Sequence, residues 1–326
     1  MPIGERLSFG YLLPTRDAVM FAKPAAGPLL ALGEQAEQLG FEAIWAGDGP
    51  LARPRHDALL MLTALASRTE RVTLATGVLL GALRPALLLA QAVATLDQIS
   101  EGRFVLGLGA GFPFPETERQ FEAVGVPYAG RVGRLAETIA AMRLLWDGAG
   151  EPVDFAGRHI SLEQAALEPA PHTPGGPPVW LAGAGEAAER RVGRIADGWM
   201  PYSPTPELYR EGLERVREAA AESGRERAPI PGLYVTVALD SSLTVAEERL
   251  SRYIEAYYGH PRELIGAIQA MYAGTPEGML DWLGPYIDAG ARHIVLRVAD
   301  EDAERGLGSA ARVRELIVEQ QTPGVR

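Results

Sequence analysis

Asp48 and His56 stand in one loop of the sequence where acid–base chemistry is expected. Asp48 follows an apolar run at 41–46 across a single glycine, and Gly49 and a proline come next. A carboxylate at the carboxyl end of a buried strand can carry a proton or hydrogen-bond a ligand. An aspartate before glycine is also ordinary turn chemistry, so a structural role for Asp48 stays open. Among the five histidines, His56 is the best candidate for a pocket residue because it lies in this loop.

Three alternating glycines end the apolar run that begins at Phe104. Gly107, Gly109 and Gly111 are followed by Phe-Pro and not by a helical pattern, so they do not form the GxGxxG fingerprint of dinucleotide-binding proteins. Glycines at a strand end let the backbone turn sharply or approach another surface closely. They would clear room for a flat ring, or they would relieve packing at a crowded barrel end.

A second glycine turn, Gly183-Ala184-Gly185, follows an apolar run and opens a helical pattern. Small residues leave the backbone N–H groups of such a turn accessible. The partial positive charge at a helix N-terminus attracts anions. The turn therefore suits a cofactor phosphate, although a tight strand-to-helix turn without any ligand would have the same sequence.

The composition excludes several other kinds of site. The chain has no cysteine, which rules out disulfides, thiolate metal ligands and a cysteine nucleophile. The histidines show neither HxH nor HExxH spacing, so we expect no metal site. The sequence also lacks the GxSxG motif that is typical of serine hydrolases.

Alternating strands and helices would position these residues. Eight short apolar runs are typical of strands buried on both faces, and helical patterns lie between them. No charged or serine-rich linker divides the chain, so we expect one domain over 1–326. Eight βα units predict an α/β fold, a (β/α)8 TIM barrel with insertions at its C-terminal face. The strands are expected at 7–13, 41–46, 71–80, 104–112, 178–182, 197–200, 232–239 and 292–298.

Several segments depart from this alternation. Residues 114–130 are rich in proline and glycine and are expected to form a loop. Residues 148–177 show little periodicity, and we expect an excursion that lies over the barrel mouth. Helical patterns at 245–258 and 262–272 predict extra helices within 245–272. The pocket would then be lined by the loops near 48–57, 112–120 and 150–175.

The charge balance limits the partners and the compartment. A net charge of −11 argues against a nucleic-acid partner. The first fourteen residues lack the basic and apolar regions of a signal peptide. No apolar run approaches the roughly 20 residues that span a bilayer. We therefore expect a cytoplasmic protein with no membrane association.

Motifs run in order through almost the whole chain. The most specific are TLDQISEGRFVLGLGAG at 95–111 and DGW at 197–199. With these motifs the chain resembles the bacterial luciferase-like oxidoreductases, a family of flavin- and deazaflavin-dependent barrels. Further matching stretches lie at 9–15, 39–48, 62–78, 121–146, 177–201 and 274–298.

The resemblance implies a flavin or deazaflavin ring over the strand ends, with its phosphate at the turn 183–185. Members of the family often have a non-prolyl cis peptide in the third strand, which forms a bulge behind the ring. Here that peptide is expected at Gly77-Val78. The cofactor-binding residues implied in this way are Asp48, Thr76, Gly77, Val78, Gly107, Gly109, Gly111, Gly183, Ala184 and Gly185.

The same resemblance implies acid–base roles. Asp48 matches an aspartate that lies near the cofactor in deazaflavin-using relatives, and Glu118 falls near a glutamate often seen after the fourth strand. Many relatives have Asp-His after the second strand, whereas this chain has Asp48-Gly49. The familiar general acid–base histidine is missing there, and His56 is the replacement available in the same loop. The expected catalytic residues are therefore Asp48, His56 and Glu118.

Two chemistries compete within this family. One is reversible hydride transfer between coenzyme F-420 and an alcohol, imine or activated alkene. The other is monooxygenation by reduced FMN and O₂, with a flavin reductase as partner. The overall length, the GTPE sequence at 274–277 and the DGW motif favour the F-420-dependent members. A non-catalytic flavin-binding barrel is a third possibility, which the presence of all eight strands and both glycine turns disfavours.

Self-association is also expected. The helical patterns near 57–68 and 85–99 contain more apolar residues than one core-facing side needs. Such a surplus is typical of a homodimer face, and tight packing against 148–177 is the alternative.

Overall fold

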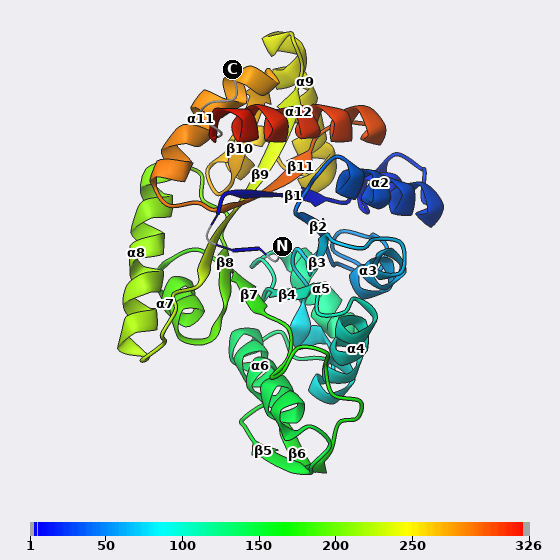
Figure 1. The fold of residues 1–326 in the computed structure, drawn as a ribbon, viewed down its shortest axis with the longest axis vertical. Helices are drawn as coiled ribbons and strands as arrows, with labels where there is room; N and C mark the ends of the chain where they lie inside the picture. The colour runs from blue at the N-terminus through cyan, green and yellow to red at the C-terminus, as the bar shows by residue number, and fades with distance from the viewer. Residues whose placement is uncertain (1–2, 5, 322–326) are drawn as a thin grey trace.

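The computed structural model describes residues 3, 4 and 6–321, and its centre is a closed barrel of eight parallel strands (Figure 1). Neighbouring strands follow the order β9-β11-β1-β2-β3-β4-β7-β8, and β8 pairs with β9 to close the barrel. The predicted fold class is confirmed. The barrel strands are β1 (Ser8–Leu12), β2 (Ala43–Ala46), β3 (Thr73–Thr76), β4 (Phe104–Leu108), β7 (Val179–Ala182), β8 (Gly198–Met200), β9 (Ile230–Leu239) and β11 (His293–Val298).

The helices surround the barrel, and several begin at polar side chains that cap them. Asp57 accepts a hydrogen bond from the backbone N–H of Leu60 at 3.1 Å, and Thr205 and Thr275 cap α8 and α11 in the same way. The helices are α1 (Asp17–Met20), α2 (Ala26–Gln38), α3 (Ala58–Ala66), α4 (Ala86–Ile99), α5 (Pro115–Ala123), α6 (Arg131–Gly148), α7 (Glu186–Ile195), α8 (Pro206–Glu222), α9 (Leu243–Tyr258), α10 (Arg262–Gly266), α11 (Pro276–Asp288) and α12 (Ala303–Gln321).

Strand β9 is shared by three neighbours. One of its edges pairs with β11 over residues 232–237. The other edge pairs with β8 only at Ile230 and Pro231, and farther along it pairs with β10 (Ala270–Gly274). The barrel is therefore closed by a short contact, and a ninth strand continues the sheet beyond it.

The prediction of a helix over 262–272 is wrong. Helix α10 ends at Gly266, and the chain then extends into β10, which pairs in parallel with β9. A short apolar run does not distinguish helix from strand by its periodicity. The open edge of β9 settles the outcome, because it supplies hydrogen-bonding partners that the isolated sequence does not reveal. The predicted loop at 114–130 likewise contains α5.

The segment 148–177 does not lie over the barrel mouth, which corrects the sequence-based expectation. It contains an antiparallel hairpin of β5 (Val153–Ala156) and β6 (Ser161–Ala165) beside α6, at the lower end of the molecule in Figure 1. The backbone N–H of Thr173 donates to Asp97 at 2.7 Å, close to the turn that precedes β4. The segment joins the end of α6 to the start of β7. It therefore lies at the amino ends of the barrel strands, whereas the mouth is at their carboxyl ends.

Three rings fill the interior of the barrel. Trp45, Trp180 and His293 have ring centroids 5.5–5.7 Å apart, and Trp45 Nε1 donates to His293 Nε2 at 2.9 Å. Facing positions on other strands are glycine. A Cβ on Gly10 would lie 2.5 Å from Trp45 Nε1, and a Cβ on Gly198 would overlap the ring of Trp180. The rings fit because these positions carry no side chain.

The outer faces of α3 and α4 expose apolar side chains where the sequence predicts a dimer contact. Leu60 is 72% exposed and Leu88 is 59% exposed. The association itself stays a prediction.

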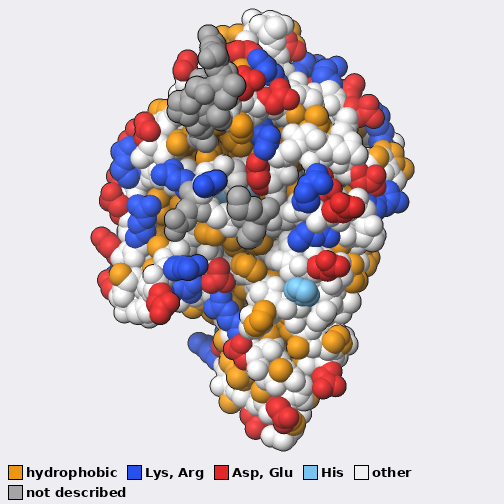
Figure 2. Space-filling view, in the orientation of Figure 1, with side chains coloured by type: hydrophobic (Ala, Val, Ile, Leu, Met, Phe, Trp, Pro, Cys, Tyr) orange, Lys and Arg blue, Asp and Glu red, His pale blue; other side chains and the backbone are white. Residues whose placement is uncertain are grey.

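Figure 2 shows one face of the molecule, on which acidic and basic side chains are intermixed with apolar ones. Within the described part of the chain, no helix has the length and apolar character needed to cross a membrane.

Burial of His293 predicts a specific pH dependence of stability. Desolvation lowers the pKa of its imidazole to about 3, from an ordinary value of about 6.5. As the pH falls below about 6.5, the unfolded chain binds a proton that the folded chain refuses, so stability decreases. Between pH 6 and 4, we expect the free energy of unfolding of the native protein to fall more steeply than that of His293→Gln, by up to about 1.4 kcal/mol per pH unit.

Denaturant unfolding at several pH values measures this difference. His172→Gln, which changes an exposed histidine, is the matched control and should keep the native slope. Parallel slopes for the native protein and His293→Gln would contradict a neutral, buried imidazole.

Candidate active site

The loop after β3 forms a bulge at the barrel mouth. The peptide between Gly77 and Val78 is cis, which confirms the position predicted from the sequence. The hydroxyl of Thr76 donates to the carbonyl oxygen of Gly107 at 2.7 Å. A Cβ on Gly107 would overlap the carbonyl oxygen of Thr76, and a Cβ on Gly109 would lie 2.7 Å from Val78 Cγ2. Both glycines are thus needed for the chain after β3 and β4 to pack this closely.

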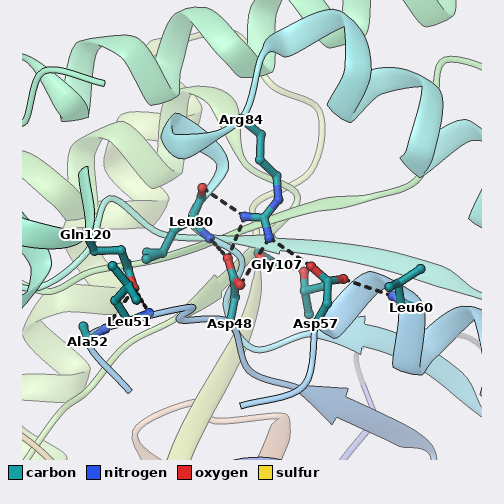
Figure 3. Close-up of polar contacts among 10 residues, drawn as sticks. Asp48, Leu51, Ala52, Asp57, Leu60, Leu80, Arg84, Gly107 and Gln120 are labelled. Carbon is teal, nitrogen blue, oxygen red and sulfur yellow. Dashed lines mark hydrogen bonds and ion pairs between the residues drawn. The ribbon is translucent and has the colours of Figure 1, made fainter. Parts of the chain in front are cut away.

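Asp48 is held in a fixed position beside this bulge. Its Oδ2 accepts from Arg84 Nη1 at 2.7 Å and from the backbone N–H of Leu80 at 3.0 Å, while Oδ1 accepts from Arg84 Nη2 at 3.2 Å (Figure 3). The carboxylate is 4% exposed, and Arg84 also approaches Asp57. A carboxylate committed to a two-pronged ion pair is a poor proton carrier. Its geometry supports a positioning role, which ties the loop after β2 to the segment after β3.

Helix α5 supports the loop after β2. Gln120 is buried, and its Oε1 accepts from the backbone N–H groups of Leu51 and Ala52, each at 3.1 Å (Figure 3). The loop therefore has anchors on both sides: Asp48 at its start and Gln120 against its middle. This matters because the same loop contains two arginines, Arg53 and Arg55, which lie over the rings of Tyr258 and Tyr257.

The other predicted catalytic residues do not join Asp48. His56 lies at the start of α3, where its Nε2 is 2.8 Å from the carbonyl oxygen of Pro24. Glu118 is exposed on α5. Gly111 has a φ of +82°, and a Cβ there would lie 2.6 Å from Thr117 Cγ2, so it directs the chain into α5.

The turn 183–185 provides the N-terminus of α7. Gly183 and Gly185 have φ values of +144° and +88°, and the space where Gly185 would carry a Cβ is open. The backbone N–H of Gly185 donates to Glu189 Oε1 at 2.9 Å. Among the described residues, the N–H groups of Ala184 and the two residues that begin α7 have no hydrogen-bond acceptor. Those free donors suit a phosphate group.

A cluster of arginines and tyrosines occupies the opposite side of the mouth, and the sequence-based prediction missed it. Arg297 points inward from β11; its guanidinium carbon is 4.1 Å from the ring centroid of Tyr257, and its Nη2 donates to Tyr258 Oη at 2.9 Å. The nearby acidic group, Asp17, accepts from Tyr253 through both oxygens. The cluster comprises Arg16, Arg53, Arg55, Arg297, Tyr202, Tyr234, Tyr253, Tyr257, Tyr258 and Asp17.

Positive charges outnumber negative charges in this cluster. Burial raises the pKa of Asp17 to about 6, because a charged carboxylate is costly away from water. Arg16, Arg55 and Arg297 therefore act on a carboxylate that takes up a proton at a higher pH than an ordinary aspartate does. The sequence contained a signal for Arg297. It lies two residues after Val295, whose side chain faces the barrel interior, and alternate residues of a strand point to the same face.

The centre of the mouth is nearly filled. Arg16, Arg55, Tyr257 and Arg297 line a cavity of about 10 Å³, which holds about one water molecule. A larger depression of about 280 Å³ lies beside α10 and is lined in part by Gln269. A tricyclic ring can enter the central site only after side chains at the mouth move.

The residues at the mouth fit a flat cofactor with a phosphate. On the side of β2, β4 and β7, the inward positions nearest the mouth are Gly47, Gly109 and Ala182, and Gly77-Val78 forms the bulge beside them. A Cβ on Gly47 would overlap Arg55 Nη1, so a ring could cover this surface once the side chain of Arg55 moves aside. The free N–H groups of Ala184 and of the first two residues of α7 follow β7 on this same side of the barrel.

Comparison with known proteins assigns the chain to a family. The family described as luciferase-like monooxygenases matches residues 7–326. This protein belongs to that family. It is accordingly an oxidoreductase of the luciferase-like class, as the resemblance in the sequence implied.

Individual relatives of this luciferase-like protein are named for different reactions. An F-420-dependent glucose-6-phosphate dehydrogenase of Rhodococcus erythropolis is 31% identical over 309 residues, which cover 86% of this chain and 90% of the relative. A solved monooxygenase from Streptomyces bottropensis has a TM-score of 0.78 at 24% identity and covers 97% and 100% of the two chains. An F-420-dependent secondary alcohol dehydrogenase, solved with an F-420–acetone adduct, has a TM-score of 0.79 at 20% identity and covers 94% and 98%.

The ion pair at Asp48 predicts a stability effect. Asp48→Asn leaves the guanidinium of Arg84 with only the more distant Asp57 as a charged partner, and we expect a loss of about 2 kcal/mol in the free energy of unfolding. Glu34→Gln, which breaks the exposed pair with Arg68, should cost less than about 1 kcal/mol. Denaturant titration of both variants measures the difference. Equal losses would show that Asp48 is not a structural anchor.

Proposed function

We propose that this protein transfers a hydride between coenzyme F-420 and a carbon atom that bears the oxygen of a small alcohol or carbonyl substrate. The observation that carries the proposal is its similarity, over 86% of the chain, to dehydrogenases that are named for their use of F-420. The cis bulge, the small residues around it and the phosphate-binding turn support the same cofactor type.

In this proposal, different parts of the mouth bind the ring, the phosphate and the substrate oxygen. The bulge at Gly77-Val78 supports one face of the ring, and the pair of Asp48 and Arg84 keeps that bulge in place. The N–H groups after Gly183 hold the phosphate. When bound, the deazaflavin supplies the two-electron hydride chemistry. The arginine–tyrosine cluster then lies on the side where the substrate oxygen would be bound.

FMN-dependent monooxygenation is the second candidate, and it rests on the description of the family as monooxygenases. It would require O₂ and a reductase partner to supply reduced flavin. A barrel that binds flavin without turnover is the remaining alternative. The choice of cofactor distinguishes all three, so a binding experiment comes first.

Fluorescence titration with F-420 and, separately, with FMN tests the proposal. We expect micromolar binding of F-420 and at least tenfold weaker binding of FMN. Ala184→Asp places a carboxylate beside the free N–H groups and should weaken F-420 binding at least tenfold, because it repels the phosphate and competes for its donors.

Ala25→Asp is the matched control, since it adds the same charge at the exposed N-cap of α2. Its affinity for F-420 should equal that of the native protein. Tighter binding of FMN would support the monooxygenase, and oxygen uptake with a reductase would then be assayed. Binding of neither cofactor would refute both enzymatic proposals.

A further inference from the structure

Tyr257 lies among three arginines at the mouth. It lies in the last turn of α9, is 5% exposed, and lines the central cavity together with Arg16, Arg55 and Arg297. Its ring centroid is 4.1 Å from the guanidinium carbon of Arg297 and 4.9 Å from that of Arg16. In the described part of the chain, none of the three predicted catalytic residues lines this cavity: Asp48 is ion-paired, His56 faces the carbonyl oxygen of Pro24, and Glu118 is exposed.

The hydroxyl of Tyr257 has a proton to give. Arg55 Nη2 donates to its oxygen at 2.8 Å, so the oxygen is an acceptor in this contact. Within the described residues, the hydroxyl has no second hydrogen bond, and its own proton has no protein acceptor. Asp17, the nearest carboxylate of the cluster, is already engaged by the hydroxyl of Tyr253 at 3.0 Å.

The guanidinium of Arg55 connects Tyr257 to the ring platform. A Cβ on Gly47 would overlap Arg55 Nη1 and would lie 3.5 Å from the carbonyl oxygen of Gly77. Arg55 therefore contacts the backbone beside the cis bulge with one nitrogen and Tyr257 with another. The phenol lies one guanidinium group away from the surface that supports the cofactor ring.

We propose that Tyr257 exchanges a proton with the oxygen atom of the substrate. This inference rests on the proposed hydride transfer. In the reducing direction, the carbonyl carbon gains a hydride from the reduced deazaflavin while the C=O double bond becomes a single bond. The O–H bond of Tyr257 breaks, and its proton completes the alcohol. The tyrosinate that remains is stabilised by Arg55 and Arg297 until solvent returns a proton; oxidation of an alcohol runs the same steps in reverse.

The charges around Tyr257 favour this role. Burial opposes ionisation of the phenol, but the positive charges of Arg55 and Arg297 outweigh it and lower the pKa of Tyr257 below its usual value. Burial instead raises the pKa values of Tyr202, Tyr234 and Tyr253. The titratable or charged groups that face Tyr257 come from α1 and its N-cap, the loop after β2, the segment after β8, β9, α9 and β11: Arg16, Asp17, Arg55, Tyr202, Tyr234, Tyr253, Tyr258 and Arg297.

Ultraviolet titration of the cofactor-free protein tests the ionisation directly. We expect one tyrosine to ionise below the ordinary pKa of about 10, and this step should disappear in Tyr257→Phe. Tyr253→Phe, one turn earlier on the same helix, should keep it. Arg55→Met keeps the phenol, and the step should move to higher pH because a stabilising charge is lost. This second variant decides the question if Tyr257→Phe fails to fold.

Steady-state kinetics with F-420 tests the proton transfer. Tyr257→Phe should bind F-420 within about threefold of the native affinity but lose at least about 100-fold in kcat. Alcohol oxidation by the native protein should rise with pH until the phenol is ionised, and the variant should lack this rise. Native kcat in Tyr257→Phe, or an early-ionising tyrosine that persists in it, would overturn the proposal. Failure of the native protein to bind F-420 would refute the proposed function instead, and the phenol titration would still give its own result.

Discussion

The contact among Trp45, Trp180 and His293 is the constraint on which the rest of the structure depends. Three rings from β2, β7 and β11 share the barrel interior, and the indole N–H of Trp45 needs an uncharged imidazole as its acceptor. The rings fit only because glycines stand opposite them, as at Gly10 and Gly198. This arrangement fixes how the strands face one another. It also fixes which residues reach the mouth, because side chains on a strand alternate between the two faces.

Two residues beyond each tryptophan, the next inward-facing position is Gly47, directly after β2, and Ala182, at the end of β7. Beyond His293, it is Val295 and then Arg297 on β11. The mouth is therefore asymmetric: one side is lined by small residues, and the other carries concentrated positive charge. A flat ring and a polar substrate oxygen need different surroundings, and this alternation places the two environments side by side. The acidic composition of the whole chain gives no hint of the local positive charge.

The sequence predicted the parts of this structure that depend on local pattern. The eight buried strands follow from their apolar runs, and the cis peptide at Gly77-Val78 follows from the family resemblance. The aspartates of the two most specific motifs have structural roles. Asp97 accepts a hydrogen bond from the backbone N–H of Thr173, and Asp197 accepts one from the backbone N–H of Val179 at the start of β7. The arginine–tyrosine cluster escaped prediction because its members come from six distant parts of the chain. Similarly, β10 becomes a strand because it pairs with the edge of β9, and β9 lies too far away in the sequence for a local pattern to reveal this pairing.

The division of one β9 edge between β8 and β10 has a consequence for the behaviour of the protein in concentrated solution. The register with β8 comprises only Ile230 and Pro231, so most of that edge would be free if the barrel alone were present. A long exposed edge is a template for pairing with another molecule. Strand β10 occupies it from Val235 to Leu239. The insertion that carries Tyr257 on its helix thus also shields the sheet against intermolecular aggregation.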